Sequence, residues 1–586
     1  MHLRRAFALV PMLGFLALEG AEPPAASAAE LQRFSSCSSL VRYARANALR
    51  THGVVGVAPQ PLMPRPVDSP VAETAPTRSG GSEDSSGTNV QEAGVDEPDM
   101  VKTDGRHVFA LAGDALHAVD ASGATPQLLG SLDLGAPSER ELLLFEGRAL
   151  VVARDFDRRP LTVLTEIDVR DPRRMRVVRT LRAEGDYSTA RLNGATARVV
   201  IGTAPELAVT SRRAIRAARL ATWLPGASLR TAGQRRGSGR HLVHCAAIRR
   251  PRSFSGLGMV TVLTIDMRQG LPGTDADAVM ADAQVVYGSQ RSLYVATQRW
   301  IDPDAVTRDP SRSVSTRIHA FDAGEAPATA YRATGQVPGH LLNQFSLSEH
   351  EGLLRVASTE TPTWLGTEQR ESESRVTVLA ADGARLVPAG SVGGLGRGER
   401  IYSVRFIDDA GYVVTFRETD PLYTLDLSVP SAPRVAGELK LPGYSAYLHP
   451  LGGGLLLGVG QAATDEGRTL GTQLSLFDVS DLARPARLHQ RTLGRDSSSE
   501  AESDHHAFLY WAPTRLAVLP VDGAAPGFRL DRATGITELG RVEHDGGASI
   551  RRALVLGDRL LTVSDRGLLA SRLSDLARLA WTPFPG

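Results

Sequence analysis

The chain has 586 residues, of which 42% are hydrophobic, 5% aromatic and 22% charged, and its formal net charge is +1. This composition is typical of a globular protein and excludes a disordered or collagen-like chain. The balanced charge argues against nucleic acid or an anionic membrane as the main partner. The two cysteines, Cys37 and Cys245, cannot form a zinc or iron–sulfur site by themselves. They leave one long-range disulfide or two separate thiols.

Residues 1–28 have the anatomy of a secretory signal peptide. Two arginines precede an apolar run over residues 6–18, and Ala26-Ser27-Ala28 offers a small-residue cleavage site. The run is too short to cross a bilayer, and no cysteine follows it to carry a lipid. No later stretch reaches the about 18 uninterrupted apolar residues of a membrane span. We therefore expect a secreted or periplasmic protein, and in that oxidising compartment a Cys37–Cys245 disulfide is the favoured interpretation.

The rest of the chain divides into three expected segments. Residues 29–55 contain an amphipathic helix with Cys37, which we expect to dock on the main domain. Residues 56–87 are rich in Pro, Ser, Thr and Gly, which is typical of a flexible linker. The main domain covers residues 88–586, with an insertion at about 205–255.

The main domain repeats one unit, in which an apolar strand ends in an aspartate and a turn follows. The clearest copies end at Asp120, Asp168, Asp266, Asp322, Asp426 and Asp478. Their spacing of about 45–60 residues, or roughly twice that, is typical of the blades of a β-propeller. We therefore predict an all-β protein, a β-propeller with eight blades, and seven or nine blades as alternatives. A β-sandwich is the less regular alternative.

The insertion is strongly basic. Between Ser211 and Arg252 the chain has eleven arginines and no acidic residue. One interpretation is a surface patch for nucleic acid or an acidic polymer. The interpretation we prefer is a solvated insertion in an early blade, which covers a blade edge and pairs Cys245 with the N-terminal helix.

Residues 86–105, which read SGTNVQEAGVDEPDMVKTDG, carry a resemblance to a known family. They resemble the opening T-N-V-Q-x-x-G-V-D-E-A-D-x-V-K-T-D-G of secreted bacterial and archaeal proteins with a C-terminal β-propeller distantly related to WD repeats. Residues 339–346, 441–450, 474–480 and 503–508 fit the same family. The resemblance covers almost the whole mature chain and implies this fold and compartment, while the activity of the family is undefined. The family usually has Asp at Ala446 and Lys at His506, so charge-dependent roles do not carry over to these positions.

The motifs that are absent favour binding over catalysis. The sequence contains no G-x-S-x-G elbow, no H-E-x-x-H, no P-loop and no EF-hand loop. Propellers place ligands at the central channel, which the entries of the innermost strands line. A Tyr-Ser opening before a strand, with a basic residue soon after it in most copies, marks this position at Tyr187, Tyr402 and Tyr444.

From this repeat we predict a polar channel mouth that binds a ligand. Its expected residues are Arg191, Asn343, Gln344, Arg405, His449, Asp504 and His505. Such a set suits a carboxylate, phosphate or sugar, because an arginine binds an oxyanion through two parallel hydrogen bonds. The alternative is that the hydroxyls satisfy backbone groups at blade junctions and the arginines pair with the aspartate turns.

Two groups of residues could bind a metal. Asp504, His505 and His506 offer ligands that suit zinc or manganese. Neighbours on a strand point to opposite faces, so both histidines could not face one ion if this segment is extended. The acidic block before and within the first blade could bind calcium, or could cap the first strand and pair with arginines. This block consists of Asp96, Glu97, Asp99 and Asp104. No cofactor is predicted, and a divalent metal such as calcium is the alternative.

The sequence thus predicts an exported, monomeric and non-catalytic scaffold that binds a protein, an anionic small molecule or a glycan, without nucleic acid and without a membrane span. The alternative is a hydrolase or lyase that acts on a sugar, a lactone or another anionic small molecule at the central channel. In that case His449 or His505 would serve as the base and an arginine as the electrophile.

Overall fold

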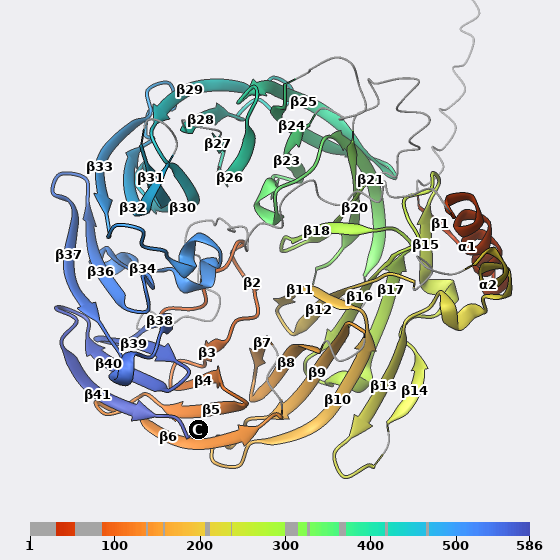
Figure 1. Cartoon of the computed structure of the whole chain (residues 1–586), viewed down its shortest axis with the longest axis horizontal. Coiled ribbons are helices and arrows are strands. Elements are labelled where there is room, and N and C mark those ends of the chain that lie inside the picture. The colour runs from red at the N-terminus through yellow and green to blue at the C-terminus, as the bar shows by residue number, and fades with distance from the viewer. Residues whose placement is uncertain are drawn as a thin grey trace, which may run out of the picture.

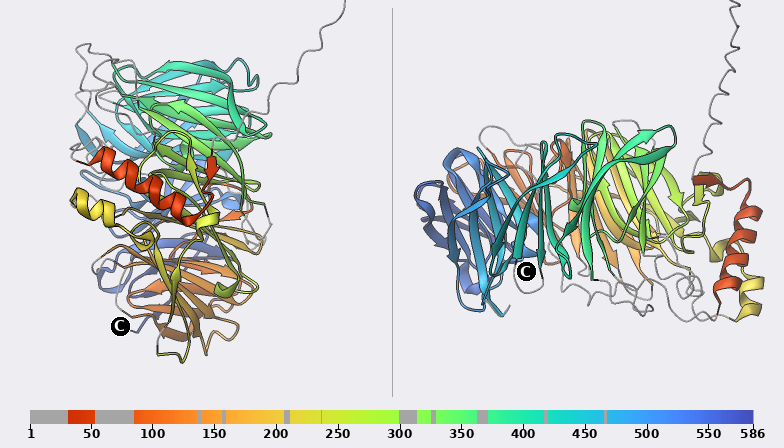
Figure 2. Two further views of the ribbon diagram at one scale, coloured as in Figure 1. Left: turned by 90° about the vertical axis from the view of Figure 1, so that its right-hand side faces the viewer. Right: turned by 90° about the horizontal axis from the view of Figure 1, so that it is seen from above.

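The computed structural model describes residues 31–52, 85–135, 139–155, 159–205, 211–235, 237–298, 314–324, 329–361, 371–416, 420–464 and 468–585. In these residues small antiparallel sheets stand in a ring around a central axis (Figure 1). Seen from the side, the ring is a thick disc with two helices at one edge (Figure 2). The all-β propeller is confirmed. The expected signal peptide and most of the expected linker lie outside the described residues.

The blades are built in chain order, with the first strand of each nearest the axis (Figure 1). Blade 1 consists of β3 (Val101–Thr103), β4 (His107–Ala112), β5 (Ala115–Asp120) and β6 (Gln127–Asp133). Blade 2 consists of β7 (Arg140–Phe145), β8 (Arg148–Asp155), β9 (Leu161–Asp168) and β10 (Arg176–Glu184). Blade 3 consists of β11 (Asp186–Asn193), β12 (Thr196–Thr203), β16 (Met259–Asp266) and β17 (Thr274–Val279).

The next three blades follow the same plan. Blade 4 consists of β18 (Ala283–Gly288), β19 (Ser292–Gln298), β20 (Ser315–Asp322) and β21 (Ala330–Pro338). Blade 5 consists of β22 (Leu347–His350), β23 (Leu353–Glu360), β24 (Glu373–Asp382) and β25 (Arg385–Leu395). Blade 6 consists of β26 (Arg400–Ile407), β27 (Ala410–Phe416), β28 (Asp420–Asp426) and β29 (Arg434–Leu441).

The last three blades complete the ring. Blade 7 consists of β30 (Tyr444–Gly452), β31 (Leu455–Ala463), β32 (Thr469–Asp478) and β33 (Ala486–Thr492). Blade 8 consists of β34 (Leu509–Trp511), β35 (Leu516–Val518), β36 (Ala525–Asp531) and β37 (Gly535–Val542). Blade 9 consists of β38 (Ile550–Leu556), β39 (Arg559–Ser564), β40 (Gly567–Arg572) and β41 (Arg578–Pro583).

The described residues therefore contain nine four-stranded units, which is one of the counts that the sequence left open beside eight. Blades 4 and 5 share one hydrogen-bonded sheet, because their outermost strands meet at a single parallel pair, Thr334 with Arg385. This pair reduces the number of separate sheets to eight without removing a blade.

The repeated aspartates have a structural reason. Each of the six ends the third strand of its blade, and its carboxylate accepts a hydrogen bond from the backbone two residues later. Asp120 Oδ1 accepts from Ser122 N at 3.0 Å, and Asp426 Oδ1 accepts from Ser428 N at 3.0 Å. Such an Asx turn satisfies a backbone donor where the strand stops, so the chain can reverse toward the outermost strand.

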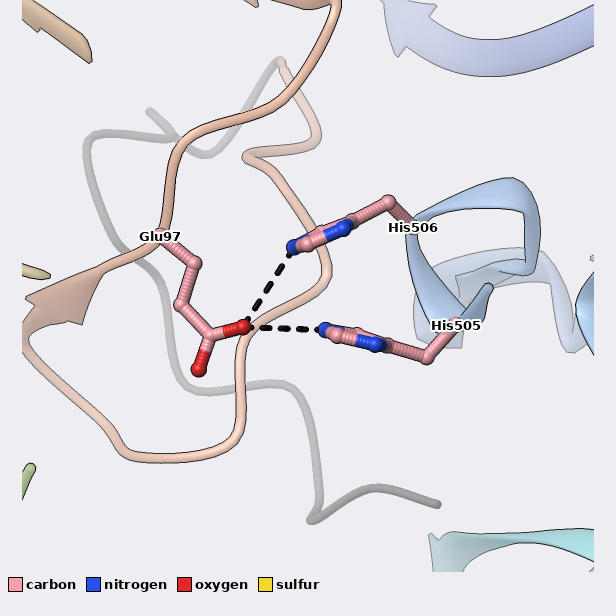
Figure 3. Close-up of side chains that lie close together, drawn as sticks. All are labelled: Glu97, His505 and His506. Carbon is pink, nitrogen blue, oxygen red and sulfur yellow. Dashed lines mark hydrogen bonds and ion pairs between the residues drawn. The ribbon is translucent and has the colours of Figure 1, made fainter. Parts of the chain in front are cut away.

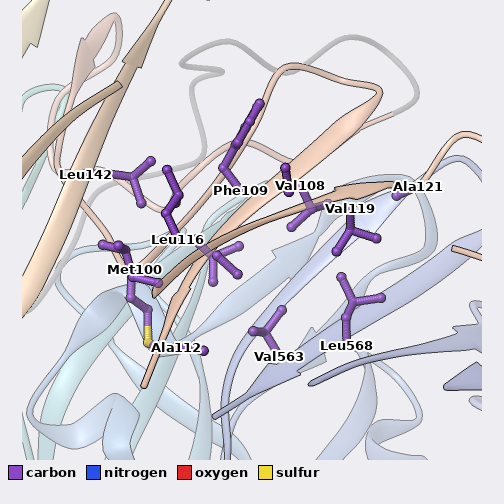
Figure 4. Packing of buried hydrophobic residues seen from close by; sticks show 14 of the residues in the cluster. Met100, Val108, Phe109, Ala112, Leu116, Val119, Ala121, Leu142, Val563 and Leu568 are labelled. Atoms are coloured by element: carbon purple, nitrogen blue, oxygen red, sulfur yellow. The ribbon is translucent and has the colours of Figure 1, made fainter. Parts of the chain in front are cut away.

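The ring closes by side-chain packing between blade 9 and blade 1. Val563 and Leu568 of blade 9 lie in one buried cluster with Leu116 and Val119 of blade 1 (Figure 4). Full burial of such a side chain contributes roughly 1.5–3 kcal/mol. A bond from Thr582 Oγ1 to the Pro126 carbonyl at 2.8 Å adds a polar contact across the same junction.

The N-terminal residues begin with a strand and continue as a helix. Strand β1 (Leu31–Arg33) pairs with β15 (Ile248–Pro251) at the outer edge of blade 3, and helix α1 (Cys37–Thr51) follows. The helix starts at Ser36 because its hydroxyl accepts from Ser39 N at 3.1 Å. Its buried residues are Leu40, Ala44 and Ala48, which lie in one buried cluster with residues of the insertion and of blade 3.

The basic insertion extends two early blades and meets this helix. Strands β13 (Gly226–Thr231) and β14 (Ser238–His241) continue blade 2 outward, and helix α2 (Arg212–Ala217) packs beside α1 (Figure 2). The Cys37–Cys245 disulfide joins the two parts, with a Cα–Cα distance of 5.3 Å. The predicted disulfide is thus confirmed, and it is compatible with an extracellular protein. Neither of the two described α-helices is long and apolar enough to cross a bilayer.

Removal of the disulfide tests how this edge is held. In Cys37→Ser/Cys245→Ser protein, α1 is expected to lose protection in amide hydrogen exchange while the blades keep theirs. The bond spans 208 residues, so the chain-entropy model predicts a loss of roughly 4–5 kcal/mol of unfolding free energy. Unchanged exchange in α1 would show that packing alone holds the helix.

Candidate functional site

A segment of the chain itself occupies the centre of the ring. We call residues 85–99 the central segment, which runs from blade 9 across the axis to the start of blade 1 (Figure 1). At one end Ser86 N donates to the Val555 carbonyl of β38 at 2.9 Å. At the other end β2 (Val95–Asp96) pairs with β11 of blade 3. Most of the motif that carries the family resemblance therefore lies at the propeller centre and occupies it.

Two amide side chains anchor the central segment. Asn89 Nδ2 donates to the carbonyls of His505 and Phe508 at 3.0 and 3.1 Å, at the entry of blade 8. Gln91 Nε2 donates to the carbonyls of Gln344 and Leu347 at 3.2 and 3.1 Å, at the entry of blade 5. Buried carbonyls require partners, and these amides supply them from a segment far away in the sequence.

The acidic residues of the central segment are paired with protein groups. Lys102 Nζ donates to Asp96 Oδ1 at 2.7 Å, and Arg552 Nε donates to Asp99 Oδ1 at 2.8 Å. Asp104 lies beyond the segment, in the turn after β3, where it accepts from the backbone of His107 at 2.7 Å. Calcium binding by the acidic block stays a prediction. The contacts above are those of the alternative interpretation, in which the acidic residues cap the first strand and pair with basic side chains.

The innermost strands present one equivalent position toward the central segment. In β11, β18, β26 and β30 a register shift marks a β-bulge near the start of the strand, and the residue three positions after the bulged one is polar. These four residues are Arg191, Tyr287, Arg405 and His449. Sequence reasoning found three of them through the Tyr-Ser repeat and missed Tyr287, whose blade lacks that opening. The position of Tyr287, three residues after the bulged residue of its strand, identifies it as the equivalent residue.

The predicted ligand-binding residues come together, but most are buried. Arg191 donates to Gln344 Oε1 at 2.7 Å and lies 3.3 Å from Glu97. His449 is 0% exposed, and its Nδ1 lies 2.6 Å from the Tyr447 hydroxyl. In the described residues, the contacts of these side chains are to protein groups. Ligand binding by this set stays a prediction.

The remaining members of the predicted set have structural contacts of their own. Asn343 Oδ1 accepts from Phe345 N at 3.0 Å and so caps a short 3₁₀ turn before blade 5. Arg405 is buried, with its guanidinium 5.7 Å from the centre of the Phe345 ring. Asp504 forms an ion pair with Arg552, a residue that the predicted set did not include.

Glu97, His505 and His506 form the densest polar cluster at the centre (Figure 3). Glu97 Oε2 lies 3.0 Å from His505 Nε2 and 3.4 Å from His506 Nε2. The centroids of the two rings lie 3.8 Å apart, and the ring planes are tilted by 38° to each other. The argument that the two histidines point to opposite faces required an extended strand, and this condition is not met, because His505–Ala507 form a 3₁₀ turn.

Charges in this cluster are strongly coupled. Burial alone would raise the pKa of Glu97, but the Arg191 guanidinium and the contacts with His505 and His506 outweigh burial and hold that pKa well below its ordinary value. Burial and the charge of His506 lower the pKa of His505. Burial opposes the charged form of His506, but Asp504 and Glu97 raise its pKa well above the ordinary value. The pKa values of the two histidines are therefore shifted in opposite directions beside one buried carboxylate.

Two cavities lie against the central segment. One has a volume of about 240 Å³, and its lining includes Asn89, Lys102, His506 and Arg552. The other has a volume of about 290 Å³, and its lining includes Lys102 and Leu144. The first cavity gives His506 a neighbouring empty space, whereas His505 and His449 are not part of either lining.

Substitution of Asn89 tests the anchoring role. Asn89→Asp replaces an amide donor by a carboxylate beside two carbonyl oxygens, so we expect a lower Tm, with a cost of roughly 1–3 kcal/mol for each carbonyl left unpaired. Asn47→Asp on α1 is the matched control, because among the described residues the Asn47 side chain bonds only within its own helix, to Tyr43 O and Arg50. Equal effects of the two substitutions would contradict the anchoring role.

Glu92 makes stability depend on pH. Its carboxylate accepts from the Tyr287 hydroxyl at 2.6 Å, and burial raises its pKa to about 7. The folded protein therefore holds a proton that the unfolded chain releases near pH 4.5, so the stabilisation by this proton is lost as the pH rises through 7. We expect the Tm of Glu92→Gln, measured relative to that of the wild type, to increase from pH 5 to pH 8. The exposed control Glu543→Gln should follow the wild type, and a constant difference for Glu92→Gln would contradict the assignment.

Solved structures with related folds align only partly with this chain. A protein from Lactobacillus plantarum shares 12% identity, with 56% of this chain and 95% of that chain covered and a TM-score of 0.31. Sqt1 from Chaetomium thermophilum, in the crystal structure with the N-terminus of ribosomal protein L10, shares 10% identity over 56% of this chain and 81% of that chain, with a TM-score of 0.33.

Sequence comparisons match two archaeal relatives. An uncharacterised protein of Methanocaldococcus jannaschii is 39% identical over 231 residues, which cover 39% of this chain and 35% of the relative. A second uncharacterised protein, from Archaeoglobus fulgidus, is 45% identical over 184 residues, which cover 31% of this chain and 27% of the relative. The chain thus spans about a third of the length of the curated relatives that it matches. The profile of the β-propeller domain matches residues 85–576, from the central segment to blade 9, and the chain therefore belongs to the β-propeller domain family.

Proposed function

We propose that this chain is an exported, non-catalytic binding scaffold that holds an anionic glycan at its basic edge. We call residues 31–52 and 211–252 the edge module. The observation that carries the proposal is its charge: residues 31–52 contain four arginines, residues 211–252 contain eleven, and neither stretch contains an acidic residue. Because the whole chain has a net charge of only +1, the remainder of the chain is acidic.

Most of these arginines are available to a partner. Nine of them are exposed and form no ion pair with another described residue: Arg42, Arg212, Arg213, Arg216, Arg219, Arg230, Arg235, Arg240 and Arg252. The disulfide and a bond from Arg45 Nε to Ala218 O at 2.9 Å hold α1 and α2 side by side (Figure 2). Guanidinium groups bind carboxylates and sulfates through two hydrogen bonds, which suits an acidic polysaccharide.

The interior supports binding rather than catalysis. His449 and His505, the bases that an enzyme mechanism would use, are 0% and 4% exposed. The central segment occupies the position above which propellers commonly bind their ligands.

The proposal is tested by binding to two defined polyanions, polygalacturonate and dextran sulfate, with neutral dextran as the uncharged comparison. The triple variant Arg212→Glu/Arg213→Glu/Arg216→Glu is expected to bind at least about tenfold more weakly at low salt, and the affinity of the wild type should fall as salt screens the charges. The measurement is the dissociation constant at several NaCl concentrations.

A matched control changes the same number of charges elsewhere. Arg397→Glu/Arg495→Glu/Arg529→Glu alters exposed arginines that no described residue pairs with and that lie outside the edge module, near blades 5 to 8. The control should bind like the wild type. Absence of binding to both polyanions, or equal loss in both triple variants, would refute the proposal. Equally tight binding to duplex DNA of matched charge would refute the choice of a glycan.

A further inference from the structure

The cluster at the propeller centre has the composition of a transition-metal site. Glu97, His505 and His506 each offer one ligand atom, and these atoms all lie within 4.8 Å of one another. Two imidazoles and one carboxylate form a ligand set that suits zinc, and three protein ligands with one position left over is a common zinc arrangement. We propose that these three residues bind one Zn²⁺ ion, which ties the central segment to blade 8.

The distances fit one ion with little movement. Two ligands that each lie 2.0–2.1 Å from a tetrahedral zinc are about 3.3 Å apart. The distances from Glu97 Oε2 to the two Nε2 atoms are 3.0 and 3.4 Å, on either side of this value. Both rings direct Nε2 to the same carboxylate oxygen (Figure 3). The 3₁₀ turn that carries the histidines makes this possible, since an extended strand would separate the rings.

One ligand atom is not satisfied by a hydrogen bond. His506 Nε2 is buried, and its 3.4 Å ion-pair contact with Glu97 Oε2 lacks the geometry of a hydrogen bond among the described residues. Buried polar atoms are nearly always bonded, so this atom requires an explanation. An ion pair between Glu97 and His505 uses the 3.0 Å contact but leaves His506 Nε2 at 3.4 Å without a hydrogen bond. A zinc ion between the three atoms would satisfy all of them.

The surroundings of the cluster support the same ion. His506 Nδ1 lies 3.2 Å from Asp504 Oδ1, and a carboxylate behind a ligand histidine fixes the ring and its tautomer. Arg552 forms an ion pair with Asp504 and so holds that carboxylate in place. Arg191 lies 3.3 Å from Oε1 of Glu97, the oxygen that the zinc would not use. The cavity of about 240 Å³ that reaches His506 has room for a water molecule as fourth ligand.

The ion would have a structural consequence. Glu97 and His505 are 408 residues apart, so a shared zinc crosslinks the entry of blade 1 to the entry of blade 8. A ligand that binds only the folded state raises its stability in proportion to the logarithm of the free ligand concentration. Zinc is therefore expected to raise the Tm of the full chain, independently of any partner at the edge module.

The test uses the full chain without an affinity tag, stripped of metal by a chelator and titrated with zinc chloride by calorimetry. We expect one zinc per chain and a higher Tm. Cobalt chloride should give the visible absorption of a tetrahedral Co²⁺ site. His506→Lys is the most informative variant, because lysine places a cation between Glu97 and Asp504 but does not replace the imidazole ligand.

The variants His506→Lys, His505→Gln and Glu97→Gln should each weaken zinc binding by at least about 100-fold and abolish the Co²⁺ absorption. Circular dichroism and the Tm of the metal-free proteins show whether each variant is folded. The exposed pair His241→Gln/His244→Gln is the control for surface binding and should bind like the wild type. No zinc bound to the wild type, or one zinc bound equally by folded His506→Lys, would overturn the proposal.

Discussion

The burial of polar groups at the propeller axis is the constraint on which the rest of the structure depends. Nine innermost strands bring carbonyls, arginines, histidines and tyrosines to the centre, and each of these groups costs free energy if it is removed from water without a partner. The central segment supplies the partners. Asn89 and Gln91 bond carbonyls of blades 8 and 5, and Glu92 and Glu97 face Tyr287 and Arg191. The centre is thus a polar core, whereas the spaces between blades are apolar.

This core also changes how the ring is held together. Blades in a repeat architecture contact mainly their neighbours, so stability is approximately a sum of local terms. The central segment adds contacts between residues that are 253 to 419 positions apart, and it does so from a single stretch of chain. Blade 9 can therefore complete the ring by packing against blade 1 without an exchanged strand. Loss of one amide anchor affects blades that do not touch each other.

The parts of the fold that sequence could predict are those with local causes. The aspartate turns repeat because each one satisfies a backbone donor two residues later, and the compartment argument led to the Cys37–Cys245 pair. The position of residues 86–99 could not be predicted, because their partners are hundreds of residues away. The meeting of both histidines with Glu97 was not predicted for a different reason: Asp504 starts a 3₁₀ turn at His505, and an argument from strand periodicity does not apply to such a turn.

The net charge of the whole chain is a poor guide to the charge that a partner contacts. The net charge of +1 argued against nucleic acid or an anionic membrane as the main partner, but it is the sum of an edge module without acidic residues and an acidic remainder. Exposed charges in about 0.1 M salt act over about 10 Å, which is short compared with the width of a nine-bladed disc. A partner therefore interacts with the charge of the edge that it contacts and not with the net charge of the chain. The same reasoning separates the edge arginines from Arg191 and Arg552, whose charges are neutralised by carboxylates of the central segment.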